Sequence, residues 1–151
     1  MNDTPAATPA PLRGSCLCGA VRFELAGRPQ WINHCHCSMC RKAQGAAFGS
    51  FLHAPGQGFR WLAGAERVRR YVSSPGNERP FCEVCGSRLP VLEDEGRHVI
   101  IPAGLLDDDP GIRPLVHIHV GSQAPWYEIG ADGLPRFDGY PPQEFWAPYR
   151  S

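Results

Sequence analysis

Seven cysteines are the residues of this sequence whose types and spacing most clearly suggest chemistry. They form three short motifs, C-x-C, C-x-C-x₂-C and C-x₂-C, made by Cys16 and Cys18, by Cys35, Cys37 and Cys40, and by Cys82 and Cys85. A disulfide between cysteines two residues apart is badly strained, and an odd number of cysteines cannot pair completely. Crowded thiolates are typical metal ligands. We expect Zn²⁺, because it is redox-inert and accepts tetrahedral sulfur.

Two other chemistries use similar motifs. An iron–sulfur cluster is also held by cysteine thiolates, and a C-x₂-C pair can act in thiol–disulfide exchange. The segment around Cys82 and Cys85 lacks the following helix that a redox pair usually has. Zinc therefore remains the favoured interpretation of the motifs.

The seven cysteines divide naturally into four and three. The two short pairs, each followed by a glycine that permits a tight turn (Gly19 and Gly86), would make a closed structural site. The remaining trio would leave one position of a tetrahedral metal for water or substrate. Spacing alone does not force this division, and a histidine could complete the trio, which would leave two chemically inert zinc sites.

The histidines near these motifs carry little weight by themselves. His34 and His36 flank the thiols, while His117 and His119 alternate along an expected strand. Each such histidine is more often an ordinary polar or core residue than a ligand. We expect these four to lie outside the metal sites.

Short strands joined by turns must position the cysteines. Alternation of apolar and polar residues predicts strands at residues 19–25, 45–53, 59–62, 67–72, 87–92, 98–101 and 115–120. One short helix is expected, with Ser38 as N-cap, Arg41, Lys42 and Ala43 inside it and Gly45 at its end. The pattern predicts a single, mainly β domain of mostly antiparallel strands. A flexible N-terminal tail is expected at residues 1–13, the domain at 14–142, and a C-terminal tail at 143–151.

Composition agrees with this picture and excludes several functions. The chain of 151 residues contains 17 glycines and 16 prolines, almost twice the usual combined share of roughly 12 %. Fifteen basic and 15 acidic residues give a formal net charge of zero. A neutral chain does not favour nucleic-acid or anionic-membrane partners. No apolar run long enough for a membrane span and no secretory signal are visible, so we expect a cytoplasmic protein.

The motifs also resemble a known family. Residues 14–21, 35–42 and 81–87, which contain the three cysteine motifs, are similar to motifs of the glutathione-dependent formaldehyde-activating enzyme family, which includes centromere protein V. The stretches 117–120, 124–127 and 134–137 resemble its C-terminal segment. The similarity runs from about Gly14 to Pro142, nearly the whole domain.

The resemblance implies a tent-like arrangement of antiparallel sheets with two zinc ions per chain. It implies a structural zinc on Cys16, Cys18, Cys82 and Cys85, and a catalytic zinc on Cys35, Cys37 and Cys40. The family's named activity joins glutathione and formaldehyde to give S-hydroxymethylglutathione, a carbon–sulfur bond reaction classed with the lyases. Members as short as this chain mostly resemble relatives of unassigned substrate. The resemblance therefore predicts the fold better than it predicts the substrate.

The expected mechanism is delivery of a metal-bound thiolate to an aldehyde carbon. Ser38 at the helix start would aim backbone N–H groups at the cysteine sulfurs. Arg41 and Lys42 would offset negative charge or meet a substrate carboxylate, or would simply be a solvated helix end. Trp126 and Tyr127 would line the pocket, or pack at an edge.

Three function classes are open at this stage. The first is a zinc enzyme acting on a thiol and a small aldehyde. The second is a zinc-stapled binding module without catalysis. The third is a chromatin or cytoskeletal partner by analogy with centromere protein V, a weak warrant that the neutral charge disfavours. We expect the enzyme.

Overall fold

A five-stranded sheet forms the centre of the molecule, and its strands bury apolar residues on one face. In this computed structural model, which describes residues 8–150, the sheet has the order β10-β3-β4-β9-β8. Its strands are β3 (Trp31–Cys35), β4 (Gly49–Pro55), β8 (Val91–Glu93), β9 (His98–Pro102) and β10 (Pro114–Ile118). The pairs are antiparallel except β10 with β3, which is parallel, so the expected mostly antiparallel arrangement is confirmed with this one exception.

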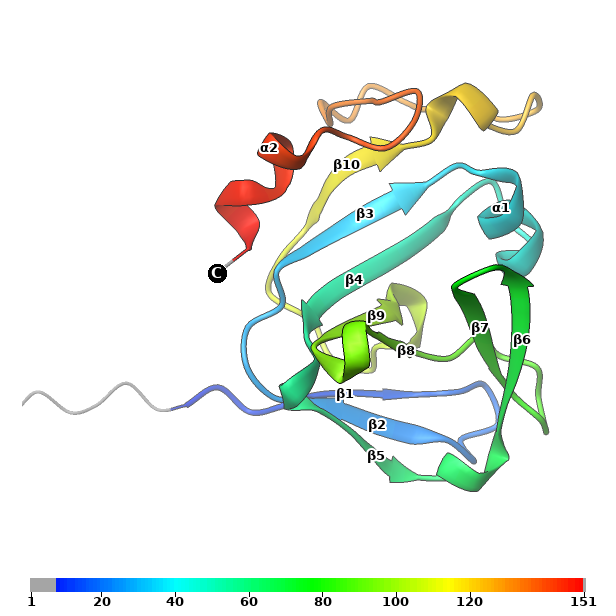
Figure 1. Cartoon of the computed structure of the whole chain (residues 1–151), viewed down its shortest axis with the longest axis vertical. Helices are drawn as coiled ribbons and strands as arrows, with labels where there is room; N and C mark the ends of the chain where they lie inside the picture. Colours follow the sequence, from blue (N-terminus) through cyan, green and yellow to red (C-terminus); the bar gives the residue numbers. More distant parts are fainter. Residues whose placement is uncertain (1–7, 151) are drawn as a thin grey trace, which may run out of the picture.

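A three-stranded antiparallel sheet covers one face of the central sheet (Figure 1). It is made of β1 (Leu12–Ser15), β2 (Arg22–Leu25) and β5 (Phe59–Ala63). The main core lies where these two sheets meet, and its buried side chains come from β2, β3, β4 and β9: Phe23, Leu25, Ile32, Leu52, Ala54, Val99 and Ile101. Burial of this apolar surface is the main force that holds the two sheets together.

The opposite face of the central sheet is packed by the C-terminal segment. Helix α2 (Gln143–Trp146) places Trp146 against Trp31 of β3, with ring centroids 4.9 Å apart. Trp146 is buried. The C-terminal part that we expected to be a tail therefore packs into the fold at this point, because two large aromatic rings gain more from mutual burial than from exposure.

A third unit, the hairpin of β6 (Val68–Ser74) and β7 (Asn77–Cys82), reaches from the region of β5 towards α1 (Ser38–Gln44) in Figure 1. Its turn is Pro75-Gly76, and Gly76 has φ +77°, as a type II turn requires. The outer residues of β6 are exposed. Short 3₁₀ turns occupy Gly56–Gly58, Ala65–Arg67, Asp94–Gly96, Ala103–Leu105, Val120–Ser122 and Ala147–Tyr149.

The mainly β, single-domain prediction is confirmed, with differences at particular elements. The expected strand at 19–25 begins only at Arg22, because Gly19 adopts φ +77° in a turn. The expected strand at 87–92 is reduced to β8, and strands β1, β3 and β7 were not predicted. Leu12 and Arg13 pair in β1, whereas residues 1–7 of the expected N-terminal tail lie outside the described part. The tent-like shape remains a prediction.

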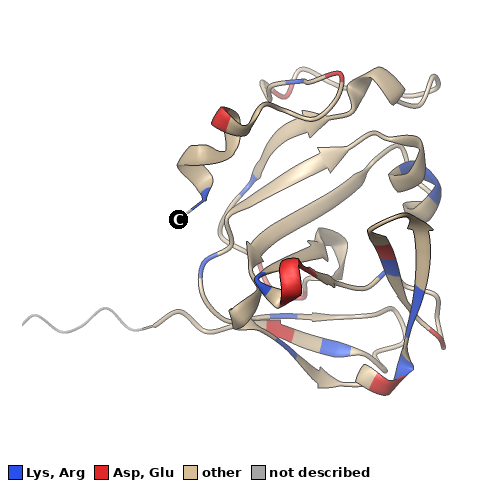
Figure 2. Ribbon diagram, in the orientation of Figure 1, with Lys and Arg blue, Asp and Glu red and all other residues tan. Residues whose placement is uncertain are grey.

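Charged residues are interspersed over the fold rather than collected on one face. Figure 2 shows basic and acidic residues alternating along the three-stranded sheet and the hairpin. Glu24 pairs with Arg60 across β2 and β5, and Glu78 pairs with Arg70 across the hairpin. No helix within residues 8–150 is long and apolar enough to span a membrane.

Gly64, which joins β5 to the hairpin, lies close to the backbone of Ala20. Its φ is +76°, and a Cβ at this position would lie 2.1 Å from the carbonyl oxygen of Ala20. We expect Gly64→Ala to lower the free energy of unfolding by about 2–4 kcal/mol, since backbone strain and overpacking add. Urea unfolding measures this loss.

Gly76→Ala is the matched control for Gly64→Ala. Gly76 has nearly the same φ, and a Cβ there meets nothing within 4 Å. It should cost only about 1 kcal/mol, the strain of the left-handed conformation. Equal losses in the two variants would show that the approach of Gly64 to Ala20 is not a rigid constraint.

Candidate metal centres and pocket

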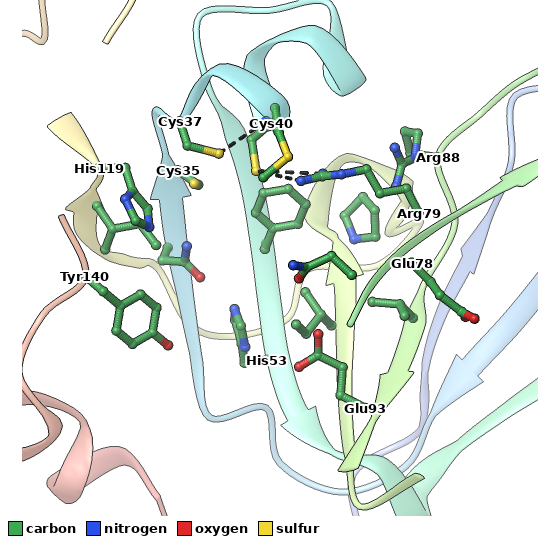
Figure 3. A pocket seen from close by; sticks show the side chains of 18 of the residues that line it. Cys35, Cys37, Cys40, His53, Glu78, Arg79, Arg88, Glu93, His119 and Tyr140 are labelled. Carbon is green, nitrogen blue, oxygen red and sulfur yellow. Dashed lines mark hydrogen bonds between the residues drawn. The ribbon is translucent and has the colours of Figure 1, made fainter. Parts of the chain in front are cut away.

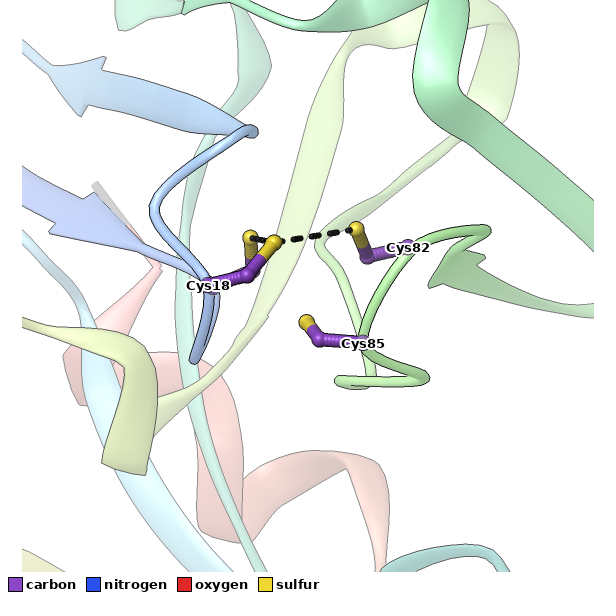
Figure 4. A group of neighbouring side chains, drawn as sticks. Cys18, Cys82 and Cys85 are labelled. Atoms are coloured by element: carbon purple, nitrogen blue, oxygen red, sulfur yellow. Dashed lines mark hydrogen bonds between the residues drawn. The ribbon is translucent and has the colours of Figure 1, made fainter.

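Four sulfur atoms converge between the β1–β2 turn and the end of β7 (Figure 4). The Sγ atoms of Cys16, Cys18, Cys82 and Cys85 all lie within 4.8 Å of one another. The Cys16–Cys18 and Cys18–Cys82 sulfur distances are 3.6 and 3.9 Å. A tetrahedral zinc with Zn–S bonds of about 2.3 Å places its sulfurs about 3.8 Å apart. The donor set and its spacing therefore fit zinc, and we call this group the four-cysteine cluster.

Tight turns hold these sulfurs in place. Gly86 follows Cys85 with φ +78°, and its N–H donates to the carbonyl of Cys82 at 2.8 Å. The N–H of Val21 donates to Cys16 Sγ at 3.3 Å, as is usual for a thiolate in a metal-binding turn. The N–H of Leu17 donates to Ser87 Oγ at 3.0 Å and so links the two turns directly.

The other three cysteines meet where β3 ends and α1 begins. The Sγ atoms of Cys35, Cys37 and Cys40, the three-cysteine cluster, also lie within 4.8 Å of one another. Among residues 8–150, no fourth Cys, His, Asp or Glu joins this group. The division into four and three that the sequence favoured is thus the grouping that the fold produces. The role of these residues as ligands remains a prediction.

Helix α1 starts differently from the expectation. Cys37, not Ser38, is its N-cap, and the N–H of Cys40 donates to Cys37 Sγ at 3.3 Å. A sulfur atom takes the capping place because an ionised thiolate accepts hydrogen bonds and is favoured at a helix N-terminus. Gly45, with φ +62°, ends the helix as predicted.

The thiols of the three-cysteine cluster are electrostatically coupled. Hydrogen bonds from the thiols of Cys35 and Cys40 lower the pKa of Cys37, and the backbone N–H of Cys40 lowers it further. The hydrogen bond with Cys37 raises the pKa of Cys35. Three adjacent thiolates repel one another unless a cation lies among them, so this donor set suits a divalent metal.

Within residues 8–150, no histidine is grouped with either cysteine cluster. His36 Nε2 and His117 Nδ1 are 2.8 Å apart, and His117 Nε2 lies 2.7 Å from Asp132 Oδ2. His34 Nδ1 contacts Ser50 Oγ at 2.8 Å. Because side chains alternate along β3, His34 and His36 point away from the face that carries Asn33 and Cys35. The end of β3 and the residue after it thus carry imidazoles on one face, while Cys35 lies on the other.

A cavity of about 350 Å³ opens beside the three-cysteine cluster (Figure 3). Its floor is the face of the central sheet that lies opposite the main core, with Asn33, Phe51, His53 and Ile100 in the lining. His119 and Tyr140 stand on one side, and Glu93 lies at the far end from the sulfurs. The size suits a small-molecule ligand.

Arg79 and Arg88 line the same cavity, and the sequence analysis did not single them out. Nη1 and Nη2 of Arg79 lie 3.9 and 4.0 Å from Cys40 Sγ. The two arginines flank the Cys82–Cys85 turn symmetrically, three residues before and three residues after it. The bridge between Phe81 and Arg88 brings the two sides of this turn together. That symmetry was the available signal in the sequence.

Other residues proposed for the pocket lie elsewhere. Arg41, Lys42, Trp126 and Tyr127 do not line this cavity. Trp126 is 70 % exposed, while the ring of Tyr127 lies 5.8 Å from that of Phe48.

Comparisons with known proteins agree with the geometry. Residues 11–122 match the family model described as glutathione-dependent formaldehyde-activating enzyme. The chain belongs to this family. A Halomonas elongata family relative, named "Putative glutathione-dependent formaldehyde-activating enzyme", is 36 % identical over 141 residues, which cover 86 % of this chain and 88 % of the relative.

Two further similarities are more distant. A Schizosaccharomyces pombe protein named as an uncharacterized lyase is 29 % identical over 85 residues, covering 56 % of this chain and 60 % of that protein. The crystal structure of a Rhodobacter sphaeroides protein shares the fold, with a TM-score of 0.51 and 24 % identity. The match covers 68 % of this chain and 91 % of the other.

The two clusters predict a metal content of two zinc ions per chain, measurable by native mass spectrometry. Cys37→Ser should leave one ion on a folded chain, since the four-cysteine cluster is untouched. Cys82→Ser should lower the thermal unfolding midpoint sharply, because a structural zinc contributes directly to folding. Retention of two ions in Cys37→Ser would contradict the assignment of the three-cysteine cluster.

Proposed function

We propose that the protein is a zinc-dependent enzyme of the carbon–sulfur lyase class. It would join a thiol, such as glutathione, to a small aldehyde, such as formaldehyde, and give an S-hydroxymethyl adduct. One observation carries the proposal: the three-cysteine cluster supplies only three sulfurs and adjoins a cavity, whereas the four-cysteine cluster is complete. Three protein ligands are typical of catalytic zinc, and four are typical of structural zinc. The names of the relatives support the same class.

In this proposal, Cys35, Cys37 and Cys40 are both ligands and catalytic residues. A zinc ion that they hold would stabilise the thiolate form of an incoming thiol. The start of α1 directs the N–H of Cys40 at Cys37 Sγ, so the chain orients its own sulfurs without the substrate. Arg79 offsets negative charge at Cys40.

The reaction is an addition whose atoms balance without another reactant. A carbon–sulfur bond forms, the carbonyl π bond breaks, and the proton from the thiol ends on the former carbonyl oxygen. Partial burial raises the pKa of Tyr140, so its phenol keeps its proton at neutral pH. Tyr140 lines the cavity, and we propose its O–H as a hydrogen-bond donor to that oxygen.

The free cysteine thiols also favour a reducing cellular compartment. All seven cysteines are free thiols in the structure, and such thiols persist in a reducing environment. We therefore propose a cytoplasmic location.

The test follows the product by NMR. Zinc-loaded protein should accelerate formation of the S-hydroxymethyl adduct from glutathione and ¹³C-formaldehyde above the uncatalysed rate. Cys37→Ser should return the rate to the uncatalysed value while the chain stays folded, because it removes only the open site. Circular dichroism and zinc analysis check the fold and the remaining ion.

Two outcomes would contradict the proposal. If the protein holds two zinc ions and produces no acceleration, the named reaction is wrong and a zinc-stapled binding module is left. If Cys37→Ser unfolds the chain as thoroughly as Cys82→Ser, the catalytic assignment of the three-cysteine cluster fails.

A further inference from the structure

One polar side chain on the floor of the cavity is deeply buried without a hydrogen-bond partner. Asn33 of β3 is only 3 % exposed, and it lines the cavity. Its Oδ1 atom is buried and accepts no hydrogen bond from the described residues 8–150. About nine-tenths or more of buried polar groups in proteins are hydrogen-bonded. The amide of Asn33 is therefore an exception that needs a physical reason.

The neighbours of Asn33 on the sheet do not satisfy this amide. Asn33 pairs with Phe51 on β4 and with Val116 on β10, and both of these side chains are apolar. Trp31 lies two residues earlier on the same face of β3. Its indole N–H also lacks a partner within residues 8–150, so it does not donate to Asn33. A carboxamide in such surroundings costs free energy that an apolar side chain of similar size would not.

Other polar residues of the same lining are already engaged. His53 Nδ1 lies 2.9 Å from His98 Nε2, and Asn77 donates from Nδ2 to Ser74 Oγ at 2.8 Å. Their partners belong to the protein itself. Asn33 instead combines deep burial with an acceptor that the described part of the chain leaves without a donor. This combination indicates a group that is kept for a ligand.

Strand geometry places Asn33 next to the three-cysteine cluster. Side chains alternate along β3, so Asn33 and Cys35 lie on the same face, about 7 Å apart along the strand. Asn33 is thus the first side chain on this face beyond Cys35. When a thiol adds to an aldehyde, the aldehyde oxygen is two bonds from the sulfur. A group that binds this oxygen must therefore stand beside the sulfurs, as Asn33 does.

We propose that Asn33 binds the aldehyde oxygen and is a catalytic residue of the proposed reaction. Its carboxamide carries two N–H donors and one acceptor oxygen, and a half-turn of its terminal torsion exchanges them. An N–H donor stabilises the negative charge that develops on the carbonyl oxygen as the carbon–sulfur bond forms. The π electrons move to that oxygen, which receives the proton lost by the thiol, while Asn33 keeps all its protons. The inference rests on the proposed function and adds a residue to it.

Asn33 and Tyr140 would act on the same oxygen from different directions. A carbonyl oxygen has two lone pairs and accepts two hydrogen bonds. Asn33 belongs to the floor of the cavity, whereas Tyr140 stands at one side of it (Figure 3). Loss of Asn33 should therefore weaken the reaction without removing every donor.

Asn33→Leu separates a catalytic role from a structural one, because leucine is similar in size and has no hydrogen-bonding atom. We expect kcat for the S-hydroxymethyl adduct to fall at least about tenfold, since removal of an oxyanion donor typically costs about 100- to 1,000-fold and Tyr140 remains. KM for the thiol should stay within about threefold, because Asn33 contacts only the aldehyde. The thermal unfolding midpoint should stay the same or rise, because no unpaired amide is buried.

Ile32→Val is the matched control on the same strand. Ile32 belongs to the main core, on the other face of β3. Loss of one methylene group there should lower the unfolding midpoint by about 2–4 °C and leave kcat unchanged. The two variants thus lose opposite properties. Should leucine be too large for the site, Asn33→Ala repeats the kinetic test with the amide removed and no bulk added.

The outcomes of these experiments are separable. If zinc-loaded wild type accelerates the reaction and Asn33→Leu keeps the same kcat, the inference is wrong and the proposed function stands. A large fall of the unfolding midpoint in both Asn33 variants also overturns the inference, since the amide would then serve the fold. A raised KM for the thiol with unchanged kcat contradicts it as well. If the wild type gives no acceleration, the proposed function fails and the inference fails with it.

Discussion

The convergence of four sulfurs from turns 64 residues apart is the constraint on which the rest of the structure depends. It ties the β1–β2 turn of the three-stranded sheet to the end of β7, and with it the β6–β7 hairpin. The hairpin has little core of its own, since most side chains of β6 are exposed. Its partly buried Val68 packs against the small core around the four-cysteine cluster. The position of Arg79 over the three-cysteine cluster therefore depends on sulfur contacts at the other end of the same strand.

Side chains alternate along the strands of the central sheet, so the residues of the main core lie on one face and the residues that line the cavity lie on the other. Leu52 and Ala54 of β4 face the main core, whereas Phe51 and His53 face the cavity. Strands β3 and β9 follow the same rule. Because one face is filled by the three-stranded sheet, the other is free to carry polar and sulfur side chains without weakening the main apolar contact. The cavity is thus formed on a rigid floor rather than between loops.

Local signals in the sequence were sufficient for the three cysteine motifs and for the end of α1, whereas spacing alone did not force the pairing of the two short motifs into one cluster. Cysteines two or three residues apart must lie in one turn, and Gly45 predicts where the helix stops. Strand β3 escaped prediction because it is buried on both faces and lacks alternation. Strand β7 contains Pro80, which argues against a strand. Arg79 and Arg88 were not singled out because pairing across the Cys82–Cys85 turn brings them together, and their symmetric spacing about that turn was the only signal of it in the sequence.

The hairpin also has a consequence for the diversity of this scaffold. Its outer residues contribute little to the main core, and its inner residues face the cavity. Replacements there can change which ligand is accepted while the sulfur turns and the central sheet stay as they are. The part of the cavity lining that the hairpin supplies and the main core are therefore built from largely separate parts of the chain.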